Sequence, residues 1–227
     1  MAAAFSLGRA AAIALGLAIP ACRRAEPVPA EPLDAAVTSA AATDASPAAQ
    51  VEAVPAATEA RTYKLVLHMG DSTVGGNHAL TFALKKRFTA EGSRFLSDTV
   101  ESASIVSVAN DSHLREIITK HNPDLVLLNL GTNEVFVPAP QALAQRIEAI
   151  VKRIGARECV WIGPPTWKPD TGIVKVIREH AAPCRFFDSS NLKLDRVVDG
   201  IHPTDAGGEQ WAAAFWEYFR GADARSP

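Results

Sequence analysis

Three short clusters in this chain contain the residue types that acyl-transfer chemistry uses. They are Gly70-Asp71-Ser72-Thr73, Gly131-Thr132-Asn133-Glu134 and Asp199-Gly200-Ile201-His202-Pro203. Each cluster taken alone is ordinary, because Gly-Asp-Ser and Gly-Thr-Asn are common turn sequences and Asp-x-x-His is often a capping arrangement. Turn formation does not explain why all three occur together, in this order, at the ends of expected strands or in the last long loop.

Ser72 is the candidate nucleophile. A serine hydroxyl reacts poorly until a base takes its proton, and an imidazole suits that role because it titrates near neutrality. We expect His202 to be this base, and Asp199 to orient the imidazole and stabilise its protonated form. The oxyanion formed during attack needs hydrogen-bond donors, and the candidates are the Asn133 side-chain amide and the Ser72 backbone N–H.

Apolar runs and helical periodicity alternate along the chain, and they define the elements that must position these residues. The sequence predicts strands over 64–69, within 94–104, over 125–130, over 158–162 and over 185–188. It predicts helices over 76–90, 113–120, 140–154, 172–181 and 205–219. This alternation indicates an α/β domain with a parallel sheet covered by helices on both faces. Ligands bind such sheets at the carboxyl ends of the strands, where Ser72 and Asn133 fall.

The three clusters resemble the motifs of the SGNH (GDSL-type) hydrolase family, and the resemblance extends from about 64 to 219. It implies a three-layer α/β/α fold with a five-stranded parallel sheet of flavodoxin-like order. It also implies that Ser72 is the nucleophile, that Asn133 lies in the oxyanion hole, and that Asp199 and His202 complete a catalytic triad. The implied activity is ester hydrolysis through an acyl-enzyme, without a metal or organic cofactor.

The sequence departs from the family pattern at two positions. The family normally has a glycine after the second strand, whose N–H also serves the oxyanion, but no glycine occurs between Gly92 and Gly131. Ser104 lies closest by spacing, and its N–H is the expected substitute donor. Glu134 stands where the family often has Asp, and we expect its longer carboxylate to hold the loop.

The N-terminus has the features of an export signal. Arg9 precedes an apolar run from Ala10 to Ile19, which is too short to span a bilayer. The run ends in Ile19-Pro20-Ala21-Cys22, which resembles a bacterial lipobox, so residues 1–21 are expected to be removed and Cys22 lipidated. An ordinary secretory signal and an unprocessed cytosolic chain are the alternatives. We expect a lipid-anchored protein that faces the periplasm.

Residues 22–61 form an Ala/Pro-rich segment that is expected to be a disordered tether. Its prolines are spread through small and acidic residues, so no apolar face can form. All four Trp, both Tyr and eight of the nine Phe follow it, which places the folded domain at 62–227. The membrane is therefore expected to contact the protein only through the anchor.

Cys159 and Cys184 remain as a pair if Cys22 is modified. Both lie at the start of expected strands and could be neighbours in a parallel sheet, so they form either a disulfide or two buried thiols. No Cys-x-x-Cys spacing supports a zinc site. The net charge of −2 and the absence of a basic stripe argue against nucleic-acid binding, and we expect a monomer.

Trp167, which follows the fourth expected strand, is a candidate for stacking on a sugar ring or covering an acyl chain. Its alternative role is to anchor the loop by packing. An O-acylated envelope glycan is the expected substrate, and a lipid ester or a thioester is the alternative within hydrolases. A non-catalytic glycan-binding or scaffold protein of the same fold, and an acyltransferase using the same residues, are the other interpretations.

Overall fold

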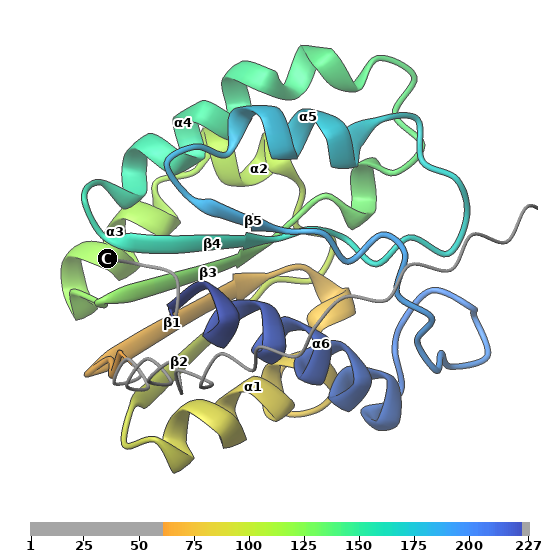
Figure 1. Cartoon of the computed structure of the whole chain (residues 1–227). Coiled ribbons are helices and arrows are strands. Elements are labelled where there is room, and N and C mark those ends of the chain that lie inside the picture. The colour runs from red at the N-terminus through yellow and green to blue at the C-terminus, as the bar shows by residue number, and fades with distance from the viewer. Residues whose placement is uncertain (1–60, 224–227) are drawn as a thin grey trace, which may run out of the picture. The chain divides into compact units, whose positions relative to one another are not determined.

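The computed structural model describes residues 61–223. The expected signal segment, Cys22 and most of the expected tether lie outside these residues. The described chain forms one five-stranded sheet in which all neighbouring strands are parallel, in the order β2-β1-β3-β4-β5 (Figure 1). The strands are β1 (Leu65–Gly70), β2 (Arg94–Thr99), β3 (Leu125–Asn129), β4 (Glu158–Ile162) and β5 (Arg185–Phe187). This is the flavodoxin-like order that the family resemblance implied, so the predicted fold class is confirmed.

Helices cover both faces of the sheet and give the domain three layers (Figure 1). Two helices, α1 (Ala79–Ala90) and α6 (Asp205–Asp223), pack on one face around Phe88, Trp211 and Phe215. The other face is covered by α2 (Ile105–Asn110), α3 (His113–His121), α4 (Ala144–Ile154) and α5 (Ile173–His180). Every residue of the central strands β1 and β3 is buried, because each has helices on both sides.

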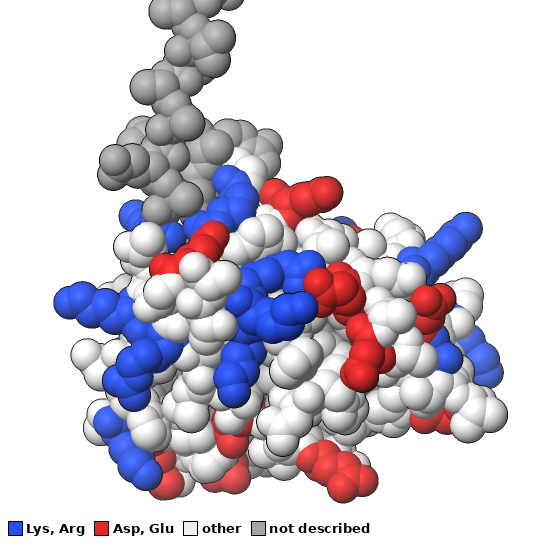
Figure 2. Space-filling view, turned by 90° about the horizontal axis from the view of Figure 1, so that it is seen from below, with Lys and Arg blue, Asp and Glu red and all other residues white. Residues whose placement is uncertain are grey.

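The face formed by α1 and α6 has a mixed charge. Figure 2 shows basic and acidic side chains lying among uncharged ones on this face. Two ion pairs join the helices, Arg87–Glu209 at 3.0 Å and Arg220–Glu91. The face therefore presents both signs of charge to solvent.

Three elements differ from the sequence-based expectation. Helix α2 was not predicted because it has six residues, too few to show a period; its Ser104–Ser107 capping box stabilises it. Helix α1 begins three residues later than predicted, because Ser72–Val74 form a separate 3-10 turn, η1, that ends at Gly75 with φ +61°. Pro140 opens a 3-10 turn, η3 (Pro140–Leu143), ahead of α4.

A disulfide joins Cys159 of β4 to Cys184, the residue before β5. Adjacent parallel strands place the two residues side by side, because Val160 pairs with Arg185 one position further on. Of the two expected states of these cysteines, the structure has the bridged one. The bridge lies at the amino edge of the sheet, opposite the predicted site.

Within residues 61–223, no helix combines the length and apolar character needed to cross a bilayer.

Candidate active site

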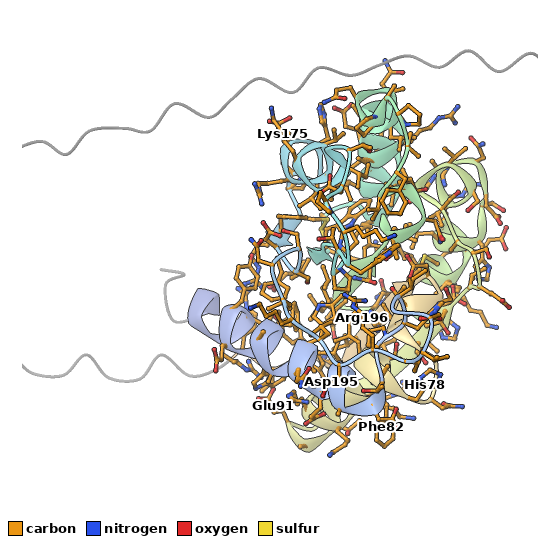
Figure 3. The ribbon with its side chains drawn as sticks, turned by 90° about the vertical axis from the view of Figure 1, so that its right-hand side faces the viewer. His78, Phe82, Glu91, Lys175, Asp195 and Arg196 are labelled. Atoms are coloured by element: carbon orange, nitrogen blue, oxygen red, sulfur yellow. A yellow bond between two sulfur atoms is a disulfide. The ribbon has the colours of Figure 1, made fainter. Side chains whose placement is uncertain are left out.

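The predicted catalytic residues lie at the carboxyl edge of the sheet. Ser72 follows β1, Asn133 follows β3, and Asp199 and His202 lie in the loop between β5 and α6. Figure 3 looks onto this edge and labels Asp195 and Arg196 of the loop and His78 and Phe82 of the α1 region. Three segments distant in the sequence are thus brought to one edge by the parallel topology.

The turn that carries Ser72 is fixed by Asp71. Asp71 caps η1 with Oδ1, which accepts hydrogen bonds from the Thr73 N–H at 2.9 Å and the Thr73 hydroxyl at 2.6 Å. The turn also needs Gly70, since a Cβ there would lie 2.7 Å from a methyl group of Val74. Ser72 is left half-buried with its side chain directed at the β5–α6 loop.

Ser72, His202 and Asp199 form a hydrogen-bonded chain. Ser72 Oγ lies 3.0 Å from His202 Nε2, and His202 Nδ1 lies 2.7 Å from Asp199 Oδ2. A nucleophile, a base and an orienting carboxylate within hydrogen-bond reach are the arrangement that serine acylation requires.

Asp199 is also held by backbone donors. Its Oδ1 accepts from the Ile201 N–H at 2.7 Å and from the His202 N–H at 3.0 Å. These bonds, and the hydrogen bond with the His202 side chain, lower the pKa of Asp199 to about 2. The side chains of His202 and Asp199 are 39% and 42% exposed, so the pair is open to solvent.

The loop that carries this pair is braced on itself and on the neighbouring loop. The Val197 N–H donates to the His202 carbonyl at 2.9 Å, and the Gly200 N–H donates to the Val197 carbonyl at 2.9 Å. The Arg196 guanidinium donates to the Ile201 carbonyl and, at 2.9 Å, to the Pro165 carbonyl. Arg196 is a supporting residue that the sequence analysis missed, because its partners are backbone atoms that no motif identifies.

Two of the three expected oxyanion donors are free to act. The Ser72 N–H opens η1, where a helical turn supplies no acceptor for it. Asn133 is exposed, and its Nδ2 donates one hydrogen bond to the Ala103 carbonyl at 2.8 Å. Since an amide nitrogen has two N–H bonds, one remains for a ligand.

The expectation for Ser104 needs correction. Its N–H donates to Ser107 Oγ at 2.8 Å within the capping box of α2, and is therefore not a free donor. The spacing placed Ser104 correctly after β2, but it did not predict the helix that begins there and uses this N–H.

Two buried carboxyl groups lie beneath the site. Glu134 is 3% exposed, and its Oε1 accepts from the Ile105 N–H at 2.8 Å. Burial raises the pKa of Glu134 to about 7, the Ile105 N–H opposes that rise, and the charge of Asp71 adds to it. Burial likewise raises the pKa of Asp71.

Trp167 packs against Phe136 at the same edge of the sheet. The ring centroids are 5.7 Å apart at 87°, and Phe136, three residues after Asn133, is 53% exposed. Trp167 itself is partly buried against the core under α2–α5. Trp167 therefore packs in the loop while part of its surface stays accessible, and Phe136 is the more exposed ring of the pair.

A separate apolar cavity of about 110 Å³ lies between β1 and helices α2 and α3, lined by residues that include Met69, Ala103, Val108 and Leu114. None of Ser72, Asn133, Asp199 and His202 lines it. Among residues 61–223, no group of three His, Cys, Asp or Glu side chains is placed to hold a metal ion.

Comparison with known proteins supports the fold through structure and not through sequence. No family model matches the chain, and no curated protein matches it. Among solved structures it is similar to Est24, a carbohydrate acetylesterase from Sinorhizobium meliloti, with 18% identity and a TM-score of 0.58 over 70% of this chain and 99% of that one. It is similar to the acetyl xylan esterase AlAXEase, with 16% identity and a TM-score of 0.55 over 68% and 98% of the two chains.

A third similar structure is a protein of the lipolytic G-D-S-L family from Desulfitobacterium hafniense. Its identity is 14% and its TM-score 0.52, over 67% of this chain and 97% of that one. In each case nearly the whole of the solved chain is covered. The similarity therefore extends over a complete domain.

Proposed function

We propose, from the premise that this chain has the fold of the SGNH hydrolases, that it is a serine esterase of that family. The observation that carries the proposal is the hydrogen-bonded chain Ser72–His202–Asp199, at 3.0 Å and 2.7 Å. A module that only bound a ligand would have no need for these hydrogen-bonded residues or for an amide donor such as Asn133 at the same edge of the sheet.

The geometry supports a two-step reaction. Ser72 Oγ attacks the ester carbonyl while His202 Nε2 takes its proton, and Asp199 stabilises the imidazolium. The Ser72 N–H and the remaining Asn133 N–H bind the oxyanion. His202 then gives the proton to the departing alkoxide, and water attacks the acyl-enzyme with His202 again acting as the base.

The proposed substrate is a short O-acyl group on a glycan. Two of the similar structures are an acetyl xylan esterase and a carbohydrate acetylesterase. The exposed ring of Phe136, packed edge-on against Trp167, offers an apolar face at the same edge of the sheet as Ser72. Aromatic faces of this kind bind sugar rings and also cover acyl chains, so a lipid ester or a thioester is the second candidate.

The proposed location is the bacterial envelope, with Cys22 lipidated and the domain on a tether in the periplasm. The support for it is the signal-like N-terminal sequence, and the Cys159–Cys184 disulfide agrees with an oxidising compartment. Replacement of Cys22 by Ser should release the full-length protein from membranes, and unchanged membrane association would contradict lipidation.

A fluorophosphonate probe tests the nucleophile directly. Wild-type protein should be labelled and Ser72→Ala should not; equal labelling of the two, or none of the wild type, would refute the assignment. Nitrophenyl acetate, butyrate and palmitate then test the acyl group, and acetylated xylan tests the glycan. Preference for acetate together with release of acetate from xylan supports the glycan ester, and preference for palmitate supports the lipid ester.

A further inference from the structure

Glu134 is a buried carboxylate in an unusual setting. It is 3% exposed, yet no basic side chain pairs with it in the described part of the chain; its Oε1 accepts from the Ile105 N–H, and its Oε2 has no hydrogen-bond partner there. Burial of a carboxyl group without a charged partner costs free energy of folding. Such a cost suggests a role beyond packing.

Asn133 and Glu134 form bonds in opposite directions to one neighbouring segment. The Asn133 amide donates to the Ala103 carbonyl at 2.8 Å, and the Ile105 N–H donates to Glu134 at 2.8 Å. We name this pair of bonds the 103–134 clasp. It joins the loop after β3 to the start of α2.

The clasp determines which way the Asn133 amide faces. Because the Ala103 carbonyl can only accept, it binds the nitrogen end of the amide, and the second N–H of that nitrogen is then available to an oxyanion. The Ala103 carbonyl is in turn held by the Ile105–Glu134 bond two residues further along the chain.

We propose that Glu134 is a positioning residue, which holds the Asn133 amide in the oxyanion hole by way of the 103–134 clasp. The proposal rests on the proposed esterase function. Glu134 is not the only cap at the start of α2, because that helix has its own capping box between Ser104 and Ser107. A hydroxyl contact between Thr73 and Thr132 at 3.2 Å ties the same loop to the nucleophile turn.

A double-mutant cycle separates positioning from general stability. Asn133→Ala should lower kcat by about 100- to 1,000-fold, as expected for loss of one oxyanion donor. Glu134→Ala should lower kcat by roughly 10- to 100-fold, with KM within about threefold, because the donor is displaced and not removed. Added to Asn133→Ala, it should cost less than about threefold, since residues acting through one group are not additive. Multiplicative losses would overturn the proposal.

Two further variants distinguish loss of positioning from loss of folding stability. Glu134→Gln keeps an acceptor oxygen for the Ile105 N–H, so its kcat should stay within about threefold of wild type. Ile154→Ala, at the far end of α4, is a matched control that loses stability while leaving kcat intact. A loss of kcat in Glu134→Gln equal to that in Glu134→Ala, or an equal loss in the Ile154 control, would count against positioning.

An NMR measurement that does not depend on activity tests the 103–134 clasp separately from the esterase function. The NMR side-chain amide signals of Asn133, identified by their absence in Asn133→Ala, should keep their chemical shifts in Glu134→Gln and move towards those of a free amide in Glu134→Ala. Unchanged shifts in Glu134→Ala would overturn the clasp even in an active enzyme. If wild-type protein neither cleaves esters nor labels at Ser72, the esterase proposal fails, and these shifts still decide the clasp.

Discussion

Asp199 serves the site through both of its oxygens, one on the His202 side chain and one on two backbone N–H groups. An Asn at this position keeps an oxygen for the backbone donors but places an amide nitrogen or a neutral oxygen against the imidazole. We predict that Asp199→Asn folds normally and lowers kcat by about 1,000-fold or more, because the wrong tautomer is favoured and the imidazolium loses its counter-charge. Ester turnover checks this, with circular dichroism as the control for folding; a loss below tenfold would argue that Asp199 is dispensable.

The low pKa of Asp199 determines how its contribution to stability changes with pH. A pKa lowered to about 2 contributes stability above its unfolded value near 3.8, and that contribution is lost only as the pH falls towards 2. Asp199 is therefore ionised at every pH between 5 and 9. Its protonation does not contribute to changes of activity in that range.

The contribution of Glu134 to stability changes with pH in the opposite direction. Its pKa is raised from 4.5 to about 7, so the folded state binds the proton more tightly than the unfolded state does. The stabilisation that results is complete below pH 4.5 and is lost as the pH rises through 7, at a cost of at most about 3 kcal/mol. Glu134→Gln has no proton to lose, so we predict that its stability relative to wild type increases between pH 5 and pH 8.

Urea unfolding at the two pH values measures this difference. Parallel behaviour of wild type and Glu134→Gln would show that Glu134 has an ordinary pKa. Asp71, also buried, changes stability in the same direction in both proteins, so the comparison largely removes its contribution.

At the scale of elements, the start of α6 determines where the β5–α6 loop lies. A Cβ on Gly208 would lie 2.2 Å from the backbone carbon of Ala79, so α6 approaches the start of α1 more closely than any side chain allows. The same turn of α6 meets the β5–α6 loop, because a Cβ on Gly207 would lie 2.0 Å from the Asp195 carbonyl oxygen. The Thr204 N–H, just before the helix, donates to that carbonyl at 2.9 Å. The position of His202 thus depends on this close approach.

We predict that Gly208→Ala destabilises the domain by more than about 2 kcal/mol, because backbone meets backbone and neither can move cheaply. Helix propensity alone predicts the reverse, a gain of about 1 kcal/mol. Thermal and urea unfolding distinguish the two, because a lower stability of Gly208→Ala supports the backbone contact and a higher stability supports helix propensity. We also expect reduced ester turnover, since the β5–α6 loop, which carries His202, must shift with the helix.

The sequence predicted most of the elements because their signals are local. Each of five elements was predicted to within four residues of its observed bounds. The strands β1, β3 and β4 were identified by their apolar runs, and the helices α4 and α6 by their periodicity. Helix α2 could not be predicted in this way, because six residues with one capping box show no period. That omission also led to the incorrect expectation for the Ser104 N–H.

The candidate site was predictable to the extent that its residues belong to motifs. Ser72, Asn133, Asp199 and His202 were identified from their types and their places after strands. Arg196 and the contact between Glu134 and Ile105 were not, because they depend on which backbone atoms meet after folding. Long-range contacts to the backbone leave no pattern in a single sequence.

At the scale of the whole molecule, the disulfide links two strands at the amino edge of the sheet. It closes a loop with a sequence separation of 25, for which loop entropy predicts a stabilisation of about 3 kcal/mol. We predict that the double variant Cys159→Ser, Cys184→Ser unfolds at a lower urea concentration than wild type and that dithiothreitol no longer affects its midpoint. A wild-type midpoint insensitive to dithiothreitol, with equal stability of the variant, would show that the bridge contributes nothing.

The two ends of β1 lie at opposite edges of the sheet: the chain enters at one, and Ser72 follows the other. The described chain enters at Arg61, at the amino edge, and six strand residues later it reaches the turn that presents Ser72 (Figure 1). A support to which the protein is attached ahead of Arg61 therefore pulls on the edge away from Ser72. We expect that the protein can be immobilised by its N-terminal side while a large polymer still reaches the proposed site from the other direction.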